Sequence, residues 1–409
     1  MSVTGLNPTQ SGTGFLSFNS LPPRLHITAE PDTEEEFDEV TIQHWRDEGY
    51  DVTYLPLGEG GKAYAEKLKG LVDDLELGES YAIIAYGDAA TICLDVATKP
   101  MPHLCALICY YPTVIPHPKA KYPTQLNLTT HLTASQDFAP TFKYYTYDGV
   151  EPGFAEHDCD EFDPVSADLA WSRSLAAVRR GFKREADLEG TWETHLGLLY
   201  HQRDAAGAAG AMTTDSSVAY VPTLTGASGQ RALYRFYKNF FVPSNPPSFR
   251  MRLLSRTLGT DRVVDEMIVS FKHDREMAWI LPNTPPTHKN VEIAMVSIVA
   301  VRGGRLVHEH MYWDQASVLV QIGLLDPNAV PGHMKKQGMK KLPVVGAEGA
   351  RKLVSPESVE SNALLPKWKE IEAKASRSVS IIGGRKSSTQ INGGANGVNG
   401  ASAKLSATA

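Results

Sequence analysis

The arrangement of apolar segments constrains the fold of this chain most. From Arg24 to about Phe182, short apolar strand-like runs alternate with segments in which apolar residues recur at helical spacing. This alternation is typical of a mostly parallel sheet covered by helices, because parallel strands need a crossover connection between them. We therefore predict an α/β first half, with strands at Leu25–Thr28, Asp51–Leu57, Tyr81–Tyr86, Leu104–Tyr111, Gln125–Thr133 and Lys143–Tyr147.

A different pattern follows a charged and small-residue stretch near Lys183–Gly190. A helix opens there with Trp192, and long strand-like segments come later in the chain, at Val263–Lys272, Val291–Arg302 and Arg305–Trp313. Gly303–Gly304 separates the last two segments, and because glycine tolerates positive φ, this dipeptide predicts a tight hairpin. The second half is therefore predicted to be α+β.

The length of 409 residues exceeds that of one ordinary domain. We predict a flexible N-terminus over 1–23, an α/β domain over 24–185 and an α+β domain over 190–326. A linker with a short helix then covers 327–375. Residues 376–409 are rich in Ser, Gly, Asn and Ala and contain no Asp or Glu, so we expect a disordered tail.

The net charge and the composition of the chain restrict the classes of partner that we expect for it. The formal net charge is −7 and no dense basic run occurs, which argues against a nucleic-acid partner. The N-terminal residues lack the basic start and apolar stretch of a secretory signal, and no segment is apolar enough to cross a membrane, so we expect a soluble cytoplasmic protein. The four cysteines have no CxxC spacing and are predicted to be reduced thiols.

Residues Tyr81–Ala90, followed by the helical Thr91–Thr98, predict a strand, a sharp turn and a helix. With the segments Leu132–Asp137 and Glu151–Ala155, this region resembles the dienelactone hydrolase family, a Cys-His-Asp variant of the α/β-hydrolase fold that opens lactones. The family cysteine falls on Gly87 and the family histidine on Pro152, whereas Asp137 matches. Because a triad needs a nucleophile and a base, the resemblance implies a catalytically degenerate domain.

Two interpretations of this first half stay open. In one, a displaced catalytic set uses Asp88, His131 or His157, while Cys93 is a poorer candidate because it falls inside the helix after the turn. In the other, the hydrolase scaffold serves packing, dimerisation or ligand binding without turnover.

The second half resembles the SnoaL-like polyketide cyclase branch of the nuclear transport factor 2-like superfamily. The resemblance lies in the helix that begins at Trp192, in Trp279–His288 and above all in Gly304–Gln315. It implies a cone-shaped barrel with a conical pocket, an acid/base Asp or His near a strand end, no metal and no organic cofactor. By analogy it also implies a homodimer.

Alternation along the last strand defines two faces. His308, His310, Tyr312 and Asp314 share one face, and Val307, Glu309, Met311 and Trp313 share the other. If the first face looks into the cone, the catalytic candidates are Asp314, His310 and His308, and the binding candidates are His273, Tyr220, Tyr234, Trp279 and Tyr312.

Other roles compete with these assignments. Asp314 precedes a helical run and is a favoured N-cap residue. Glu309 is either a solvated outer charge or a group that orients a histidine, and the aromatic residues are also ordinary core candidates. A metal at His308 and His310 is disfavoured, because no CxxC or His-Glu-x-x-His pattern accompanies the pair.

Three functions remain from the sequence alone. The first is a cofactor-independent enzyme that isomerises, cyclises or dehydrates a carbonyl-bearing metabolite in the second domain. The second is a non-catalytic ligand-binding or dimerisation protein, and the third is a lactone or ester hydrolase with a displaced catalytic set.

Overall fold

The structure is a computed structural model that describes residues 22–382. Residues through Val354 pack as one compact unit, and the chain from Ser355 onward forms another. The predicted boundary near 185–190 lies inside the first unit. We call residues 24–182 of this unit the first-sheet region and residues 188–322 the second-sheet region.

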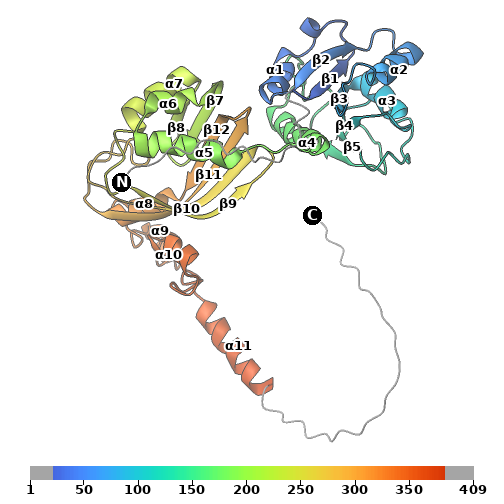
Figure 1. Cartoon of the computed structure of the whole chain (residues 1–409). Helices are drawn as coiled ribbons and strands as arrows, with labels where there is room; N and C mark the ends of the chain where they lie inside the picture. Colours follow the sequence, from blue (N-terminus) through green and yellow to red (C-terminus); the bar gives the residue numbers. More distant parts are fainter. Residues whose placement is uncertain (1–21, 383–409) are drawn as a thin grey trace, which may run out of the picture. The chain divides into compact units, whose positions relative to one another are not determined.

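The first-sheet region is built on a six-stranded parallel sheet with the order β2-β1-β3-β4-β5-β6 (Figure 1). Its strands confirm the sequence expectation to within two residues at each end: β1 Arg24–Ala29, β2 Asp51–Pro56, β3 Tyr81–Tyr86, β4 Leu104–Tyr110, β5 Asn127–Thr133 and β6 Tyr144–Tyr147. β3 and β4 are almost wholly buried, because helices cover both faces of a parallel sheet.

The helices of this region divide between the two faces. One core cluster joins α1 (Glu39–Asp47) and α4 (Pro164–Phe182) to the sheet through Trp45, Leu175 and Val178. The other joins α2 (Gly61–Gly70) and α3 (Gly87–Val96) to the opposite face. A short 3₁₀ helix, η1 (Glu34–Glu36), precedes α1.

The second-sheet region is built on another six-stranded sheet, with the order β8-β7-β12-β11-β10-β9. Its strands are β7 Met212–Tyr220, β8 Thr225–Ser228, β9 Arg250–Leu258, β10 Arg262–Lys272, β11 Asn290–Arg302 and β12 Arg305–Trp313. Neighbours are antiparallel except β12 and β7, which are parallel. The predicted hairpin is confirmed: Gly303 and Gly304, with φ of 56° and 71°, join β11 to β12 in a turn of type I′ character.

Helices pack with this sheet around a single core cluster. They are α5 (Leu188–Leu196), α6 (Ala205–Gly210), α7 (Gln230–Phe236) and α8 (Gln315–Ile322). Two π-helical turns continue α5 and α7 without a break, namely η2 (Gly197–Gln202) and η3 (Tyr237–Phe241). Such turns are rare and occur often at functional sites.

The two sheet regions contact each other within the first unit. The Glu48 carboxylate, at the end of α1, accepts hydrogen bonds from Arg179 Nη2 (2.6 Å) and from the backbone N–H of Gly303 (3.0 Å). A Cβ atom at Gly303 would collide with the carbonyl oxygen of Asp47. The hairpin tip therefore needs glycine for both its backbone conformation and this close approach.

The C-terminal part departs from the sequence expectation. The predicted linker contains α9 (Gly332–Lys336) and α10 (Glu348–Val354). The predicted short helix around 364–371 is α11 (Trp368–Ile382), so residues 376–382 are helical rather than part of a disordered tail. Residues 383–409 of the predicted tail, like most of the predicted flexible N-terminus, lie outside the described residues.

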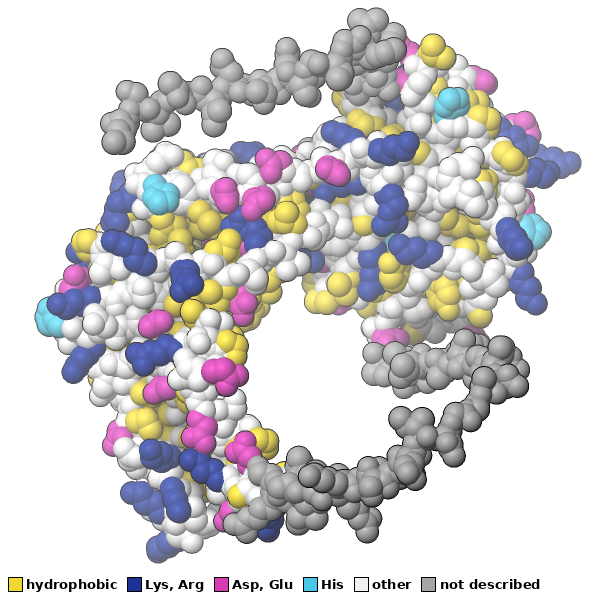
Figure 2. All heavy atoms as spheres, turned by 60° about the horizontal axis from the view of Figure 1, so that its bottom comes forward, with side chains coloured by type: hydrophobic (Ala, Val, Ile, Leu, Met, Phe, Trp, Pro, Cys, Tyr) yellow, Lys and Arg dark blue, Asp and Glu magenta, His cyan; other side chains and the backbone are white. Residues whose placement is uncertain are grey.

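The sequence argued against nucleic-acid and membrane partners, and two structural features concern these expectations: the distribution of surface charge and the character of the helices. On the face shown in Figure 2, basic and acidic side chains are intermixed. Among residues 22–382, no helix has the length and apolar character that crossing a bilayer requires.

Candidate functional site

The face of β12 that carries Glu309 packs into the core of the second-sheet region. Glu309, Met311 and Trp313 are buried, whereas His308 and His310 are half-buried and Tyr312 is 42% exposed. The sequence left open which face of β12 looks into the core, and the structure places the Glu309 face there. The side chain that β12 places in the interior of this region is the carboxyl of Glu309, and the imidazoles of His308 and His310 lie on the other face.

Glu309 is buried in an apolar environment. The residue is 1% exposed, and its Oε2 atom has no hydrogen-bond partner among the residues that the structure describes. Burial raises the pKa of this carboxyl to about 8, because the low-dielectric core penalises the charged form. At pH 7 the carboxyl is mainly protonated. Because its pKa is close to this pH, it can both donate and accept a proton.

Three buried tyrosines lie within electrostatic range of Glu309. The pKa values of Tyr200, Tyr220 and Tyr237 are all raised well above the ordinary range, first by burial and then by the charge of Glu309. The hydroxyls of Tyr200 and Tyr220 are buried without a partner in the described structure, while the Tyr237 hydroxyl donates to Met212 Sδ at 3.5 Å. Tyr200 and Tyr237 come from the two π-helical turns.

His195 of α5 adds an imidazole to this interior. Both of its ring nitrogens are buried and lack a partner in residues 22–382. The ring stacks on Trp192 at 5.8 Å between centroids and lies 6.1 Å from the Tyr237 ring. Burial lowers the pKa of His195 to about 4, so the imidazole is neutral and has one donor and one acceptor nitrogen.

Buried polar atoms without partners cost folding free energy, about 1–3 kcal/mol each. Several such unpartnered atoms lie in the interior of the second-sheet region, on Glu309, Tyr200, Tyr220 and His195. These groups have unused hydrogen-bonding capacity, and the carboxyl can add or remove a proton. We call these four residues and Tyr237 the interior polar set.

A groove adjoins this interior between α5 and the strands β9 and β10. It has a volume of about 390 Å³, and its apolar lining includes Leu196, Met251, Met267 and Met311. Met311 follows Glu309 by two residues on the same face of β12, so the groove and the carboxyl share one surface of the sheet.

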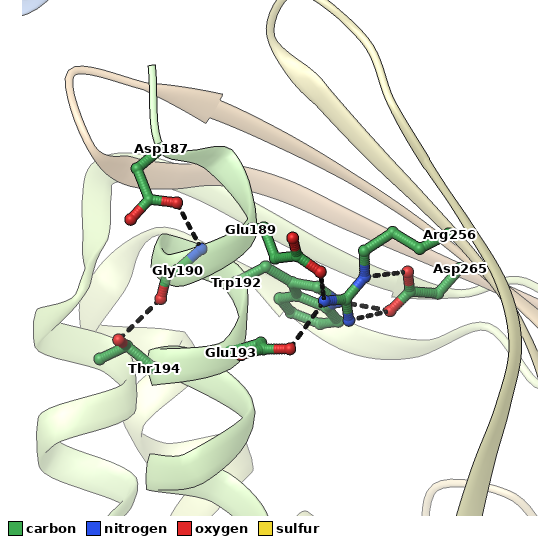
Figure 3. Close-up of polar contacts among 8 residues, drawn as sticks. All are labelled: Asp187, Glu189, Gly190, Trp192, Glu193, Thr194, Arg256 and Asp265. Atoms are coloured by element: carbon green, nitrogen blue, oxygen red, sulfur yellow. Dashed lines mark hydrogen bonds and ion pairs between the residues drawn. The ribbon is translucent and has the colours of Figure 1, made fainter. Parts of the chain in front are cut away.

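A charged network forms one side of the groove (Figure 3). The buried Asp265 carboxylate accepts hydrogen bonds from Trp192 Nε1 (2.8 Å) and from Arg256 Nε and Nη2 (2.8 and 2.9 Å). Arg256 also contacts the exposed carboxylates of Glu189 and Glu193 (2.9 and 3.0 Å). The network fixes α5, which carries His195, against β9 and β10.

The structure places none of the three predicted catalytic residues, Asp314, His308 and His310, in this interior. Asp314 caps α8, where it accepts hydrogen bonds from Ala316 N (3.0 Å) and Ser317 Oγ (2.5 Å). His308 and His310 stack on each other with centroids 4.5 Å apart on the opposite face of β12. The geometry of Asp314 is that of a helix cap.

The predicted binding residues divide between the core and other positions. Tyr220 and Trp279 lie in the core, with ring centroids 5.3 Å apart, and Tyr220 belongs to the interior polar set. His273 is buried after β10 and binds Thr287 Oγ1 through Nδ1 at 3.1 Å. The Tyr234 ring lies against Lys238 Nζ, 5.4 Å away, and Tyr312 is exposed.

In the first-sheet region, the strand–turn–helix around Gly87 is present, and Gly87 has a φ of 50°. The carboxylate of Glu30 occupies the space where a side chain at position 87 would lie, and its Oε1 accepts the Asp88 N–H at 2.6 Å. Asp137 lies in the loop after β5, and Pro152 lies in a turn after β6. The resemblance to a hydrolase domain stays a prediction; what the structure shows is the parallel sheet.

Two further residues of the proposed displaced set have structural contacts. His131 is fully buried, and its ring nitrogens bind Tyr147 Oη (2.8 Å) and Ser174 Oγ (2.9 Å). The Asp88 side chain accepts a hydrogen bond from Thr113 Oγ1.

All four cysteines are free, and burial raises the pKa of Cys93 to about 12. No group of three or more His, Cys, Asp or Glu among the described residues is arranged to hold a metal ion.

Replacing Gly87 by alanine is expected to destabilise the protein by about 1–2 kcal/mol more than replacing Gly58 by alanine. Both glycines have positive φ, but only a Cβ at position 87 meets a neighbour, Glu30. Urea unfolding of G87A, G58A and the double variant E30A/G87A measures the difference. Equal losses for the two glycines would show that Glu30 does not fill this position, whereas partial recovery in the double variant supports it.

Comparisons with solved structures find partial similarities at low sequence identity. A putative SnoaL-like polyketide cyclase from Jannaschia sp. CCS1 is 15% identical, with 35% of this chain and 99% of that chain covered and a TM-score of 0.29. AclR, a putative hydroxylase from Streptomyces galilaeus, is 16% identical over 36% of this chain and 91% of its own, with a TM-score of 0.28. A nuclear transport factor 2-like protein of unknown function from Burkholderia pseudomallei K96243 is 15% identical over 34% and 98%, with a TM-score of 0.27.

No protein-family model matches the chain, and no curated protein matches it. The structural similarities cover about a third of this chain and are too low to assign an activity. Function must be argued from the site itself.

Proposed function

We propose that the second-sheet region catalyses proton transfer on a small carbonyl-bearing molecule, with Glu309 as the acid/base group. The observation that carries this proposal is the buried carboxyl with its free Oε2 atom and a pKa raised to about 8. Enzymes that transfer protons near neutral pH use groups whose pKa lies close to the working pH. A structural carboxyl in a core is more commonly paired.

The surrounding groups suit the chemistry of an enol intermediate. In its ionised form Glu309 removes a proton from the carbon next to the carbonyl, and the protonated carboxyl then returns it to another carbon. The hydroxyls of Tyr200 and Tyr220 are free to donate hydrogen bonds to the oxygen that gains negative charge. Isomerisation, cyclisation and dehydration of carbonyl compounds all begin with such a proton transfer.

Exchange of the α-protons of a ketone for deuterium tests this proposal without knowledge of the natural substrate. The full chain is incubated with 2-tetralone in D₂O, and the loss of the α-proton signals is followed by NMR. We expect the wild type to accelerate exchange and E309Q to lose about 10²-fold or more of that acceleration, because glutamine cannot transfer the proton. The acceleration should grow as the pH rises towards about 8, where the carboxylate form becomes populated.

Glu266→Gln is the matched control, because Glu266 lies half-buried on β10 of the same sheet and binds Ser255 Oγ at 3.2 Å. It should exchange like the wild type. Equal exchange in E309Q and wild type would exclude Glu309 as the acid/base group. Binding of the ketone without accelerated exchange would favour the ligand-binding alternative.

A further inference from the structure

A second cavity lies within the first unit, on the histidine face of β12. It has a volume of about 240 Å³ and is bordered by α1, α4, the ends of β3 and β4, and the hairpin strands β11 and β12. Its aromatic lining includes Trp45, Tyr86, Phe162 and Trp171. Because a water molecule occupies about 30 Å³ in the liquid, this space holds a molecule of the size of one substituted aromatic ring.

One wall carries a histidine oriented by a buried carboxylate. His157 Nδ1 lies 2.9 Å from Asp38 Oδ2, and the backbone N–H of His157 donates to the same oxygen at 3.0 Å. Thr41 Oγ1 donates to it at 2.6 Å. These hydrogen bonds lower the pKa of Asp38 to about 2 although burial opposes this, so the carboxylate is ionised and can only accept.

The ionised carboxylate fixes the tautomer of His157. Nδ1 must carry the proton that it shares with Asp38, which leaves Nε2 as an acceptor in the neutral ring. In the part of the chain that the structure describes, Nε2 has no hydrogen-bond partner. The Phe162 ring packs on the imidazole at 4.5 Å between centroids and holds its orientation.

Two more imidazoles border the cavity. His44 lies edge-on to His157 at 5.5 Å between centroids, and His308 of β12 lies opposite α1 and α4 in the lining. Burial lowers the pKa of both to about 4, so they are neutral at pH 7. His308 Nδ1 is buried and unpartnered within residues 22–382. Asp168, Asp261 and Arg302 also line the cavity, which thus combines aromatic walls and imidazole nitrogens with charged groups.

We propose that this cavity is a second small-molecule site and that it binds an aromatic compound with a hydroxyl group, such as a simple phenol. The aromatic ring lies among the tryptophan, tyrosine and phenylalanine side chains, and the hydroxyl donates its hydrogen bond to His157 Nε2. An acceptor nitrogen of fixed tautomer selects a donor over an ether of the same shape, because the ether covers Nε2 without offering it a hydrogen bond. This site is independent of the interior polar set, since it lies on the opposite face of β12.

The test compares 4-methylphenol with 4-methylanisole at pH 7, where the phenol keeps its proton and the anisole carries a methyl group in its place. Isothermal titration of the full chain should show 4-methylphenol binding about tenfold more tightly than 4-methylanisole, the ratio that one hydrogen bond gives. In His157→Gln this ratio should fall towards one. His117→Gln is the matched control, because His117 forms an exposed pair with Asp95 at 3.0 Å outside the cavity, and it should keep the ratio.

A second variant covers the case in which His157→Gln fails to fold. Ala167 of α4 lines the cavity, so Ala167→Leu fills part of it without changing the Asp38–His157 pair, and it should abolish binding of both compounds. Glu309→Gln should leave both affinities unchanged. The proposal is overturned if the wild type binds the two compounds equally or not at all, if the ratio persists in His157→Gln, or if Ala167→Leu binds like the wild type.

Discussion

Replacing Glu309 by glutamine is expected to stabilise the protein at pH 7 and to remove part of the pH dependence of its stability. The carboxyl has an ordinary pKa of about 4.3 in an unfolded chain and about 8 in the folded protein. Between these two values the folded state holds a proton that the unfolded state has lost. Stability from this group is therefore fully present below about pH 4 and falls as the pH rises towards 8.

The expected size follows from the same linkage. Each pKa unit corresponds to about 1.4 kcal/mol, so the loss between pH 5 and pH 7 is of the order of 2–3 kcal/mol. Urea unfolding of wild type and E309Q at both pH values isolates the contribution, because other titrating groups change both proteins alike. We expect the two to differ little at pH 5 and E309Q to be more stable at pH 7. An unchanged difference between the two pH values would show that Glu309 is ionised in the folded protein.

Replacing Asp265 by alanine is expected to destabilise the protein by about 3–5 kcal/mol. The carboxylate is 1% exposed and accepts hydrogen bonds from Trp192 and Arg256 (Figure 3). Its removal leaves a largely buried guanidinium and an indole N–H without their partner, and the desolvation of these groups is then uncompensated.

Glu193→Ala is the matched control in the same network. Its carboxylate contacts the same Arg256, but its side chain is 62% exposed, so water screens the pair and the expected loss is below about 1 kcal/mol. Urea unfolding at pH 7 compares the two variants. If D265A costs no more than E193A, the network contributes surface electrostatics only and does not anchor α5.

The sequence predicted the strands of the first sheet and the strands β10, β11 and β12 of the second, because hydrophobic periodicity and glycine positions are local signals, but it missed β7, β8 and β9. The strands β3 and β12 were predicted at their observed bounds, and Gly303–Gly304 identified the hairpin. The candidate site was predicted only in part. Alternation separated Glu309 from His308 on β12, but it does not state which face is interior.

A further signal was present in the sequence. Met311 and Trp313 share the face of Glu309, whereas the other face carries two histidines, a tyrosine and an aspartate. The more apolar face is the better candidate for the core. The π-helical turns that bring Tyr200 and Tyr237 close to Glu309 have no comparable local signal, because they depend on how α5 and α7 pack in three dimensions. The pairing of Asp38 with His157, 119 residues apart, likewise depends on the tertiary fold.

Strand β12 presents consecutive residues on opposite sides of its sheet: His308 borders the aromatic cavity, and Glu309 lies in the buried interior on the other side. The two side chains are separated by one peptide bond. An insertion or deletion of a single residue in this strand would exchange them, placing an imidazole in the core and a carboxyl against the aromatic walls. In the evolution of this protein the cavity and the interior therefore depend on one register of the strand, and a change in its length alters both.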